Sequence, residues 1–65
     1  MITVNGREFD INEQQKLSEF LNQEGFETLR IAVERNGEIV PKSAYDKTVL
    51  NDHDTLEVVS FVGGG

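Results

Sequence analysis

Residues 2–11 read Ile2-Thr3-Val4-Asn5-Gly6-Arg7-Glu8-Phe9-Asp10-Ile11, and two short runs of alternating apolar and polar side chains flank the Asn-Gly pair. Asn and Gly adopt the positive φ angles of a type I′ turn with little strain. Side chains alternate between the faces of a strand, so Ile2 and Val4 share one face, as do Phe9 and Ile11. The sequence therefore predicts a β-hairpin over residues 1–11.

A short amphipathic helix is expected next. Leu17, Phe20 and Leu21 have the i, i+3, i+4 spacing of an apolar helical stripe, and Gly25 is placed to end the helix in a left-handed cap. The start of the helix is poorly marked, because Lys16 is a weak capping residue. A helix of about ten residues is not stable alone. We therefore expect it to pack on the hairpin.

The second half of the chain contains three more predicted strands. Residues 30–35 form the third strand, which ends at a second Asn-Gly pair, Asn36-Gly37. Residues 38–40 form a short return strand, and Pro41 stops it because proline has no N–H for a central ladder. Residues 55–61 form the last strand.

Between the last two strands the pattern is irregular. Residues 42–46 are expected to form one helical turn, with Tyr45 as its apolar anchor, and residues 48–50 to pair briefly with a neighbour. Residues 51–54 are a turn by composition.

The predicted order is β-β-α-β-β-β, which belongs to the α+β class. One helix packs on a mixed, mainly antiparallel sheet, and the domain spans residues 1–62 with a flexible glycine tail at residues 63–65. The helix stripe is expected to be buried against the inward positions of three strands, namely Ile2, Val4, Ile31, Val33, Leu56 and Val58.

The charge and the apolar content of the chain exclude several classes of function. The 65 residues carry twelve acids against six bases, a formal charge of −6, and contain no cysteine. This charge argues against a nucleic-acid or membrane partner and favours a basic protein surface. No apolar run approaches the ~20 residues that cross a bilayer, so a cytoplasmic domain is expected. Nearly every large apolar side chain is needed for the core, which favours a binding or carrier module over an enzyme.

His53 lies between Asp52 and Asp54, a pattern that superficially suggests a metal site. A zinc site needs three or four ligands, and the chain offers no second histidine and no cysteine. The segment is therefore interpreted as a turn, with His53 or a neighbour at positive φ. We expect no catalytic residue and no bound metal.

The last strand has an outward face. One helix covers only one face of the sheet, so Leu56 and Val58 should face it while Val59 and Phe61 point away. Val59 and Phe61, with Val62 beside them, are the candidate docking residues. A β-bulge in this strand would reverse the parity and bury Phe61, and this alternative stays open here.

The chain ends in Gly63-Gly64-Gly65. A frayed end would explain these glycines, because they cannot pack and lose entropy when ordered. The functional interpretation is that a thread without Cβ atoms enters a narrow channel and presents the Gly65 carboxylate to another enzyme. A carboxylate is inert to nucleophiles until its oxygen becomes a good leaving group, so this use implies activation by ATP.

These features together resemble the ubiquitin-like sulfur carriers of the β-grasp fold, and within them the ThiS family of thiamine biosynthesis. The resemblance covers essentially the whole chain and is best in residues 33–41, Val49-Leu50, Asp52-His53-Asp54, residues 56–59 and residues 61–65. The family usually has glycine where this chain has His53.

The resemblance implies a mechanism. A ThiF-like adenylyltransferase would bind the sheet surface through Val59, Phe61 and Val62 and draw the tail, Gly63 and Gly64, towards MgATP. The Gly65 carboxylate would become an acyl-adenylate, and a persulfide sulfur donor would convert it to a thiocarboxylate. Thiazole synthase (ThiG) would take that sulfur. No cofactor is bound by the carrier itself, since MgATP is used by the activating enzyme.

Three alternatives remain at this point. The same tail chemistry serves sulfur carriers of molybdopterin and other pathways. A ubiquitin-like modifier would join Gly65 to a lysine amine. A non-covalent β-grasp interaction module would leave the tail unused.

Overall fold

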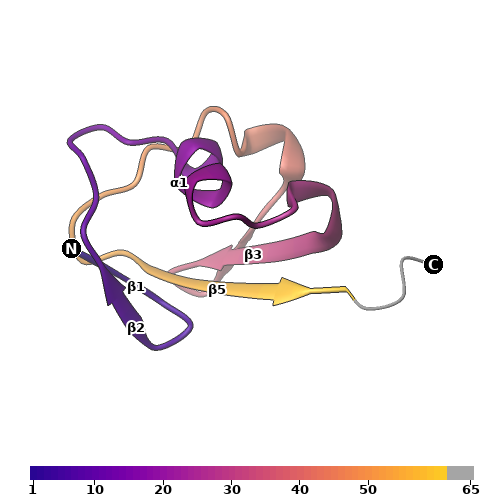
Figure 1. Ribbon diagram of the computed structural model, residues 1–65, viewed down its shortest axis with the longest axis horizontal. Coiled ribbons are helices and arrows are strands. Elements are labelled where there is room, and N and C mark those ends of the chain that lie inside the picture. The colour runs from indigo at the N-terminus through magenta and orange to yellow at the C-terminus, as the bar shows by residue number, and fades with distance from the viewer. Residues whose placement is uncertain (62–65) are drawn as a thin grey trace.

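The computed structural model describes residues 1–61, which form a five-stranded mixed sheet with one helix on one face (Figure 1). The elements in chain order are β1 (Ile2–Val4), β2 (Arg7–Phe9), α1 (Leu17–Gln23), the 3-10 turn η1 (Thr28–Arg30), β3 (Ile31–Arg35), β4 (Glu38–Val40), the 3-10 turn η2 (Lys42–Ala44) and β5 (Thr55–Ser60). The predicted β-β-α-β-β-β order and α+β class are confirmed.

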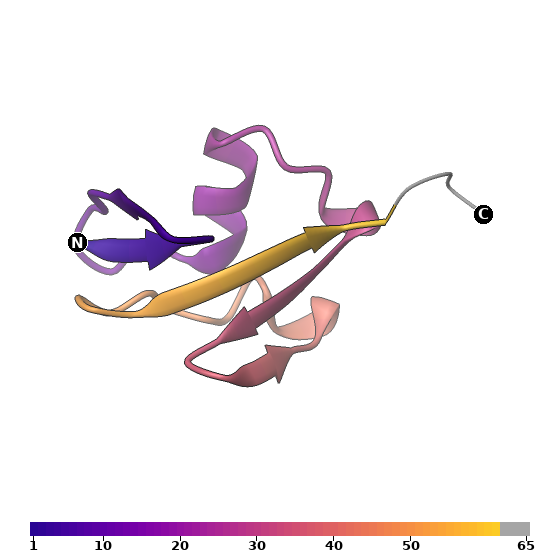
Figure 2. The same cartoon turned by 90° about the horizontal axis from the view of Figure 1, so that it is seen from below.

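The strands lie in the order β2-β1-β5-β3-β4, so the last strand of the chain is the central one. It pairs parallel with β1 and antiparallel with β3, and the two outer pairs are antiparallel hairpins. Figure 2 shows the sheet from below, and in this view the strands lie in front of α1. The other face of the sheet is therefore free of the helix.

Both predicted Asn-Gly turns are confirmed. Asn5 and Gly6 have φ angles of +49° and +82°, and Asn36 and Gly37 have +52° and +86°. Each asparagine also bonds to β5 through its side chain. The Asn5 amide donates to the Val58 carbonyl (3.0 Å) and accepts from the Val58 N–H (2.8 Å), while the Asn36 amide oxygen accepts from the Thr55 N–H (2.9 Å). The sequence pattern predicted the turns but not the hydrogen bonds from the asparagine side chains to β5.

Helix α1 begins without a side-chain cap on its own N–H groups, as the weak signal at Lys16 indicated. A distant segment supplies the missing acceptors, because the carbonyls of Thr48 and Tyr45 accept from the N–H groups of Leu17 (2.8 Å) and Ser18 (3.0 Å). The helix has seven residues, shorter than the length expected from the sequence.

The end of α1 is a Schellman motif. Gly25 has a φ of +81°, the Phe26 N–H donates to the Leu21 carbonyl (2.9 Å), and the Gly25 N–H donates to the Asn22 carbonyl (3.1 Å). The predicted glycine cap is confirmed.

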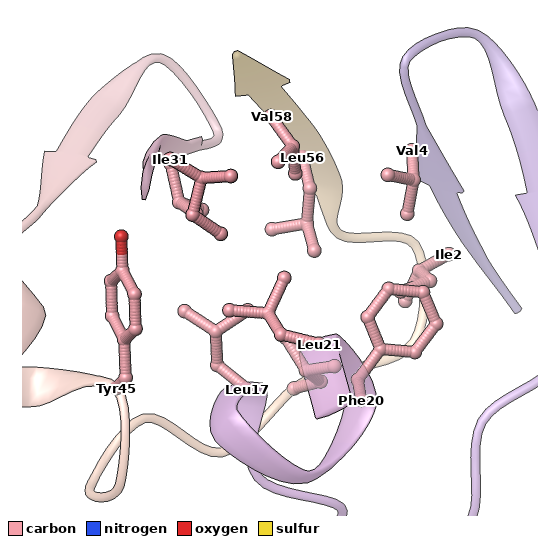
Figure 3. Close-up of a cluster of buried hydrophobic side chains, with 11 residues drawn as sticks. Ile2, Val4, Leu17, Phe20, Leu21, Ile31, Tyr45, Leu56 and Val58 are labelled. Atoms are coloured by element: carbon pink, nitrogen blue, oxygen red, sulfur yellow. The ribbon is translucent and has the colours of Figure 1, made fainter. Parts of the chain in front are cut away.

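The core lies between α1 and the sheet (Figure 3). Leu17, Phe20 and Leu21 are buried against the six strand residues predicted from the sequence: Ile2, Val4, Ile31, Val33, Leu56 and Val58. The rings of Phe9 and Phe20 form a T-shaped pair with ring centres 5.5 Å apart, so the helix packs on the hairpin as expected. Tyr45 is buried too, and this confirms its predicted role as the anchor of the turn over residues 42–46. Val49 forms a single bridge with Lys16, the brief pairing expected there.

Asp54 is a buried polar residue that the sequence did not single out. It accepts hydrogen bonds from Arg35 Nε (2.9 Å), the Asn36 side-chain amide (2.9 Å) and the Asn51 N–H (2.9 Å). Burial alone would raise the pKa of Asp54, but these hydrogen bonds and the Arg35 charge outweigh it and hold the pKa below its usual value. The carboxylate thereby joins the β3–β4 turn to the start of β5.

We expect Leu17→Ala and Leu21→Ala each to lower the free energy of unfolding by about 2–5 kcal/mol, because each leaves a cavity under the helix. Leu29 is the matched control, since it is the same residue type and is exposed. Leu29→Ala should change the free energy of unfolding by less than about 0.5 kcal/mol. Thermal and denaturant melts of the three variants measure this, and wild-type melts for Leu17→Ala would refute the core assignment.

The Asp54 cluster predicts a pH dependence. Because folding lowers the pKa of Asp54, its contribution to stability is present above the unfolded-state pKa, near ~3.9, and is lost as the pH falls through the lowered folded value. Asp54→Asn should be less stable than the wild type at pH 7, and the gap should narrow in acid. Denaturant melts between neutral and acid pH measure this, and a gap that stays constant would contradict the assignment.

Candidate functional site

The side chains of β5 alternate between the helix-covered face and the free face of the sheet. Leu56 and Val58 are 0% and 7% exposed under α1, whereas Val59 and Phe61 are 59% and 55% exposed. The predicted parity is confirmed. The alternative with a β-bulge is wrong, because β5 pairs with β3 in unbroken register from Leu56 to Ser60.

Strand pairing places residues of β3 and β4 beside Val59 on the face of the sheet that α1 leaves free. We call this surface the outer face and define it by six residues: Ala32, Glu34, Ile39, Glu57, Val59 and Phe61. Val59 lies opposite Ala32, and Glu34 lies between Ile39 on β4 and Glu57 on β5. Ile39 is 76% exposed and was not predicted as a docking residue. The sequence could have predicted this position of Ile39. A two-residue turn at Asn36-Gly37 fixes Ile39 opposite Glu34, so the two side chains share one face of the sheet.

Phe61 is held where the chain leaves the sheet. Its N–H donates to the Arg30 carbonyl (2.8 Å), and its ring centre lies 5.8 Å from Lys42 Nζ. The same ammonium donates to the Ile31 carbonyl (2.6 Å), beyond the last β3–β4 pair at Val33 and Val40. Lys42 therefore takes the place of a strand partner and contacts Phe61 by a cation–π interaction. The other site residues predicted from the sequence, Val62, Gly63, Gly64 and Gly65, lie outside the described residues.

His53 belongs to an exposed turn. Its φ of +72° confirms the prediction of a left-handed residue there. Its Nε2 lies 3.4 Å from Asp52, whose carboxylate also pairs with the Met1 amine, while Asp54 turns inward to Arg35. The hydrogen bond and charge of the Met1 amine lower the pKa of Asp52, with a further contribution from His53. The two aspartates thus have other partners and do not converge on His53.

The described residues contain neither a metal-binding cluster nor a membrane-spanning helix. Among residues 1–61, the structure brings together no group of three or more His, Cys, Asp and Glu side chains able to hold a metal ion. The one α-helix in this part of the chain is too short and too polar to cross a membrane.

A polar hollow lies beside the start of α1, lined by Asn12, Glu13, Gln14, Gln15, Glu19 and Gln23. Its most buried member, Gln15, already bonds to the Asn12 N–H and to Gln23. This hollow therefore offers carboxylates and carboxamides but no hydroxyl, thiol or amine group. The outer face and the exit of β5 remain the candidate site, and their chemistry is that of binding.

Comparison with known proteins shows the family to which the chain belongs. A family model described as the ThiS family matches residues 2–65. The sulfur carrier protein ThiS of Bacillus subtilis is 35% identical over 66 aligned positions, which cover all of both chains. The thiazole synthase of Paramagnetospirillum magneticum is 42% identical over 64 positions, which are 98% of this chain but only 20% of the synthase.

A solved structure agrees with the fold. The crystal structure of a thiamine biosynthesis protein (ThiS) from Geobacter metallireducens superposes with a TM-score of 0.78 at 34% identity, covering 98% of this chain and 97% of that one. The fold is thus the ubiquitin-like β-grasp fold expected from the sequence. By the family model and by these relatives, the chain belongs to the ThiS family.

Proposed function

We propose that this chain is a sulfur carrier for thiazole formation in thiamine biosynthesis. It acts as a protein co-substrate, and the Gly65 carboxylate carries the sulfur as a thiocarboxylate. The observation that carries the proposal is that the match to the ThiS family extends from residue 2 to residue 65, through the glycine tail.

The proposed activation starts at the tail. The Gly65 carboxylate attacks the α-phosphorus of MgATP on a ThiF-like adenylyltransferase, the bond between the α- and β-phosphates breaks, and pyrophosphate leaves. A persulfide donor then attacks the acyl carbon of the adenylate and displaces AMP. A thiol reduces the sulfur–sulfur bond of the resulting acyl disulfide and leaves the thiocarboxylate. Residues 63–65 have no side chains, which suits a narrow channel.

The proposed partners follow from the same steps. The adenylyltransferase binds the outer face through Val59 and Phe61, with Val62 next to them. Thiazole synthase accepts the sulfur. The Paramagnetospirillum thiazole synthase supports this pairing, because one fifth of its length is similar to this chain.

The proposed chemistry depends on the length of the tail. Deleting Gly65 moves the reacting carboxylate by up to ~3.5 Å, and a misplacement of about 1 Å can cost ~100-fold in rate. We expect ATP–pyrophosphate exchange with the cognate adenylyltransferase to be lost on deletion of Gly65, on addition of a residue after it, and in Gly64→Val.

His53→Ala is the control for the tail variants, since its side chain is exposed and precedes β5, whereas the tail follows β5. It should retain wild-type exchange, and all the variants should melt like the wild type. Normal exchange without Gly65, or loss of exchange in a folded His53→Ala protein, would overturn the carrier proposal.

The proposed docking depends on Phe61. Phe61→Ala should weaken binding to the adenylyltransferase, because it removes an exposed aromatic anchor that the fold holds at the tail's exit. The free energy of unfolding should fall by no more than about 1 kcal/mol, the strength of an exposed cation–π contact. Calorimetric titration and melts measure the two effects. A strong loss of stability would mean that Phe61 is a core residue.

Intact-mass analysis of the protein isolated from cells separates the alternatives. A sulfur carrier shows one oxygen replaced by sulfur, a protein modifier shows an added protein mass, and a non-covalent module shows neither. Molybdopterin and thiamine carriers share the same mass change, so growth without added thiamine after deletion of the gene separates those two.

A further inference from the structure

Two carboxylates oppose each other on the outer face. Glu34 on β3 and Glu57 on β5 are direct cross-strand partners, and both side chains are exposed. Side chains in such a pair have Cβ atoms about 5 Å apart, and like charges at this position destabilise the sheet. The pair therefore opposes folding.

Within residues 1–61, no ion pair supplies a counter-charge to Glu34 or Glu57. In the part of the chain that the structure describes, the ion pairs involve Met1, Arg30, Arg35 and His53, and none of them includes Glu34 or Glu57. Arg35, the neighbour of Glu34 in sequence, points to the opposite face and bonds to Asp54. A binding partner can supply the positive charge that would offset the repulsion between Glu34 and Glu57.

The surroundings of the pair are apolar. Ile39 lies opposite Glu34 on the other side of β3, and Val59 lies two positions beyond Glu57 on the same face of β5. Both are large hydrophobic side chains exposed to solvent. The surface thus combines two adjacent negative charges with an apolar border, which complements a long cationic side chain with an apolar stem.

We propose that the outer face binds a protein surface that places an arginine between Glu34 and Glu57. The planar guanidinium has five N–H donors and can bond to both carboxylates at once, while its stem packs on Ile39 and Val59. The inference rests on the proposed function, in which the protein that binds this face is the adenylyltransferase. The formal charge of −6 also draws a basic surface towards the whole domain.

The experiment uses two effects of opposite sign. In the double variant Glu34→Gln/Glu57→Gln, the melting temperature of the free protein should rise by ~1–5 °C, because the cross-strand repulsion is removed. Its affinity for the adenylyltransferase, measured by calorimetric titration at low salt, should fall by roughly tenfold or more, because charge-assisted hydrogen bonds are lost. The loss should shrink as salt rises.

Glu13→Gln/Glu24→Gln is the matched control, because it removes the same amount of charge from exposed positions on the helix side of the sheet. Glu13 lines the hollow beside the start of α1, and Glu24 is the residue that ends α1. This control should lose less than about threefold in affinity, because it changes only the weaker, screened attraction of the net charge. An equal loss of affinity in both double variants would mean that only the net charge of the domain matters for binding. That result would overturn the arginine site.

Failure of this inference differs from failure of the proposed function. Wild-type pyrophosphate exchange together with unchanged affinity of the Glu34/Glu57 variant would overturn the arginine site and leave the carrier function standing. Binding that depends on Glu34 and Glu57 without any pyrophosphate exchange would overturn the carrier function and leave the site standing. An unchanged or lower melting temperature of the double variant would overturn the repulsion on which the inference is built.

Discussion

The central position of β5 is the constraint on which the rest of the structure depends. It pairs with β1 on one edge and β3 on the other, so the whole sheet is assembled around a strand from the end of the chain. A shift of its register by one residue would exchange the two faces, placing Val59 in the core and Val58 in solvent. Two turn asparagines oppose such a shift, because Asn5 bonds to both backbone groups of Val58 and Asn36 bonds to the Thr55 N–H. The turns that shape the hairpins therefore also fix the strand that carries Val59 and leads to Phe61, the two candidate docking residues.

Local features of the fold could be predicted from the sequence because each rests on neighbouring residues. The Asn-Gly pairs require positive φ angles, Gly25 ends a helical stripe, and the alternation along β5 separates Val58 from Val59. Other features depend on residues far apart in the chain. The acceptors for the first N–H groups of α1 come from residues 45 and 48, and Lys42 reaches the Ile31 carbonyl and the Phe61 ring across the edge of the sheet.

The candidate site shows the same division. Val59 and Phe61 were predicted from the period of one strand, and Ile39 follows in the same local way from the β3–β4 hairpin. The opposition of Glu34 to Glu57 depends instead on the long-range pairing of β3 with β5. Asp54 has the composition of a turn residue, and its role in joining Arg35 and Asn36 to β5 comes from tertiary contact. The assignment of the tail glycines and Val62 still rests on the sequence and the family, since these residues lie outside the described part of the chain.

A sheet covered on one face only separates the requirements of folding from those of binding. The inner face must exclude water, and two adjacent carboxylates without a counter-charge would carry a large desolvation penalty there. On the outer face water screens the same pair, so the repulsion between Glu34 and Glu57 is small enough for the core to offset. Charges that oppose folding can therefore persist only where they are exposed, and that is also where a partner protein can reach them. The outer face can change to suit a partner while the residues under α1 keep the fold.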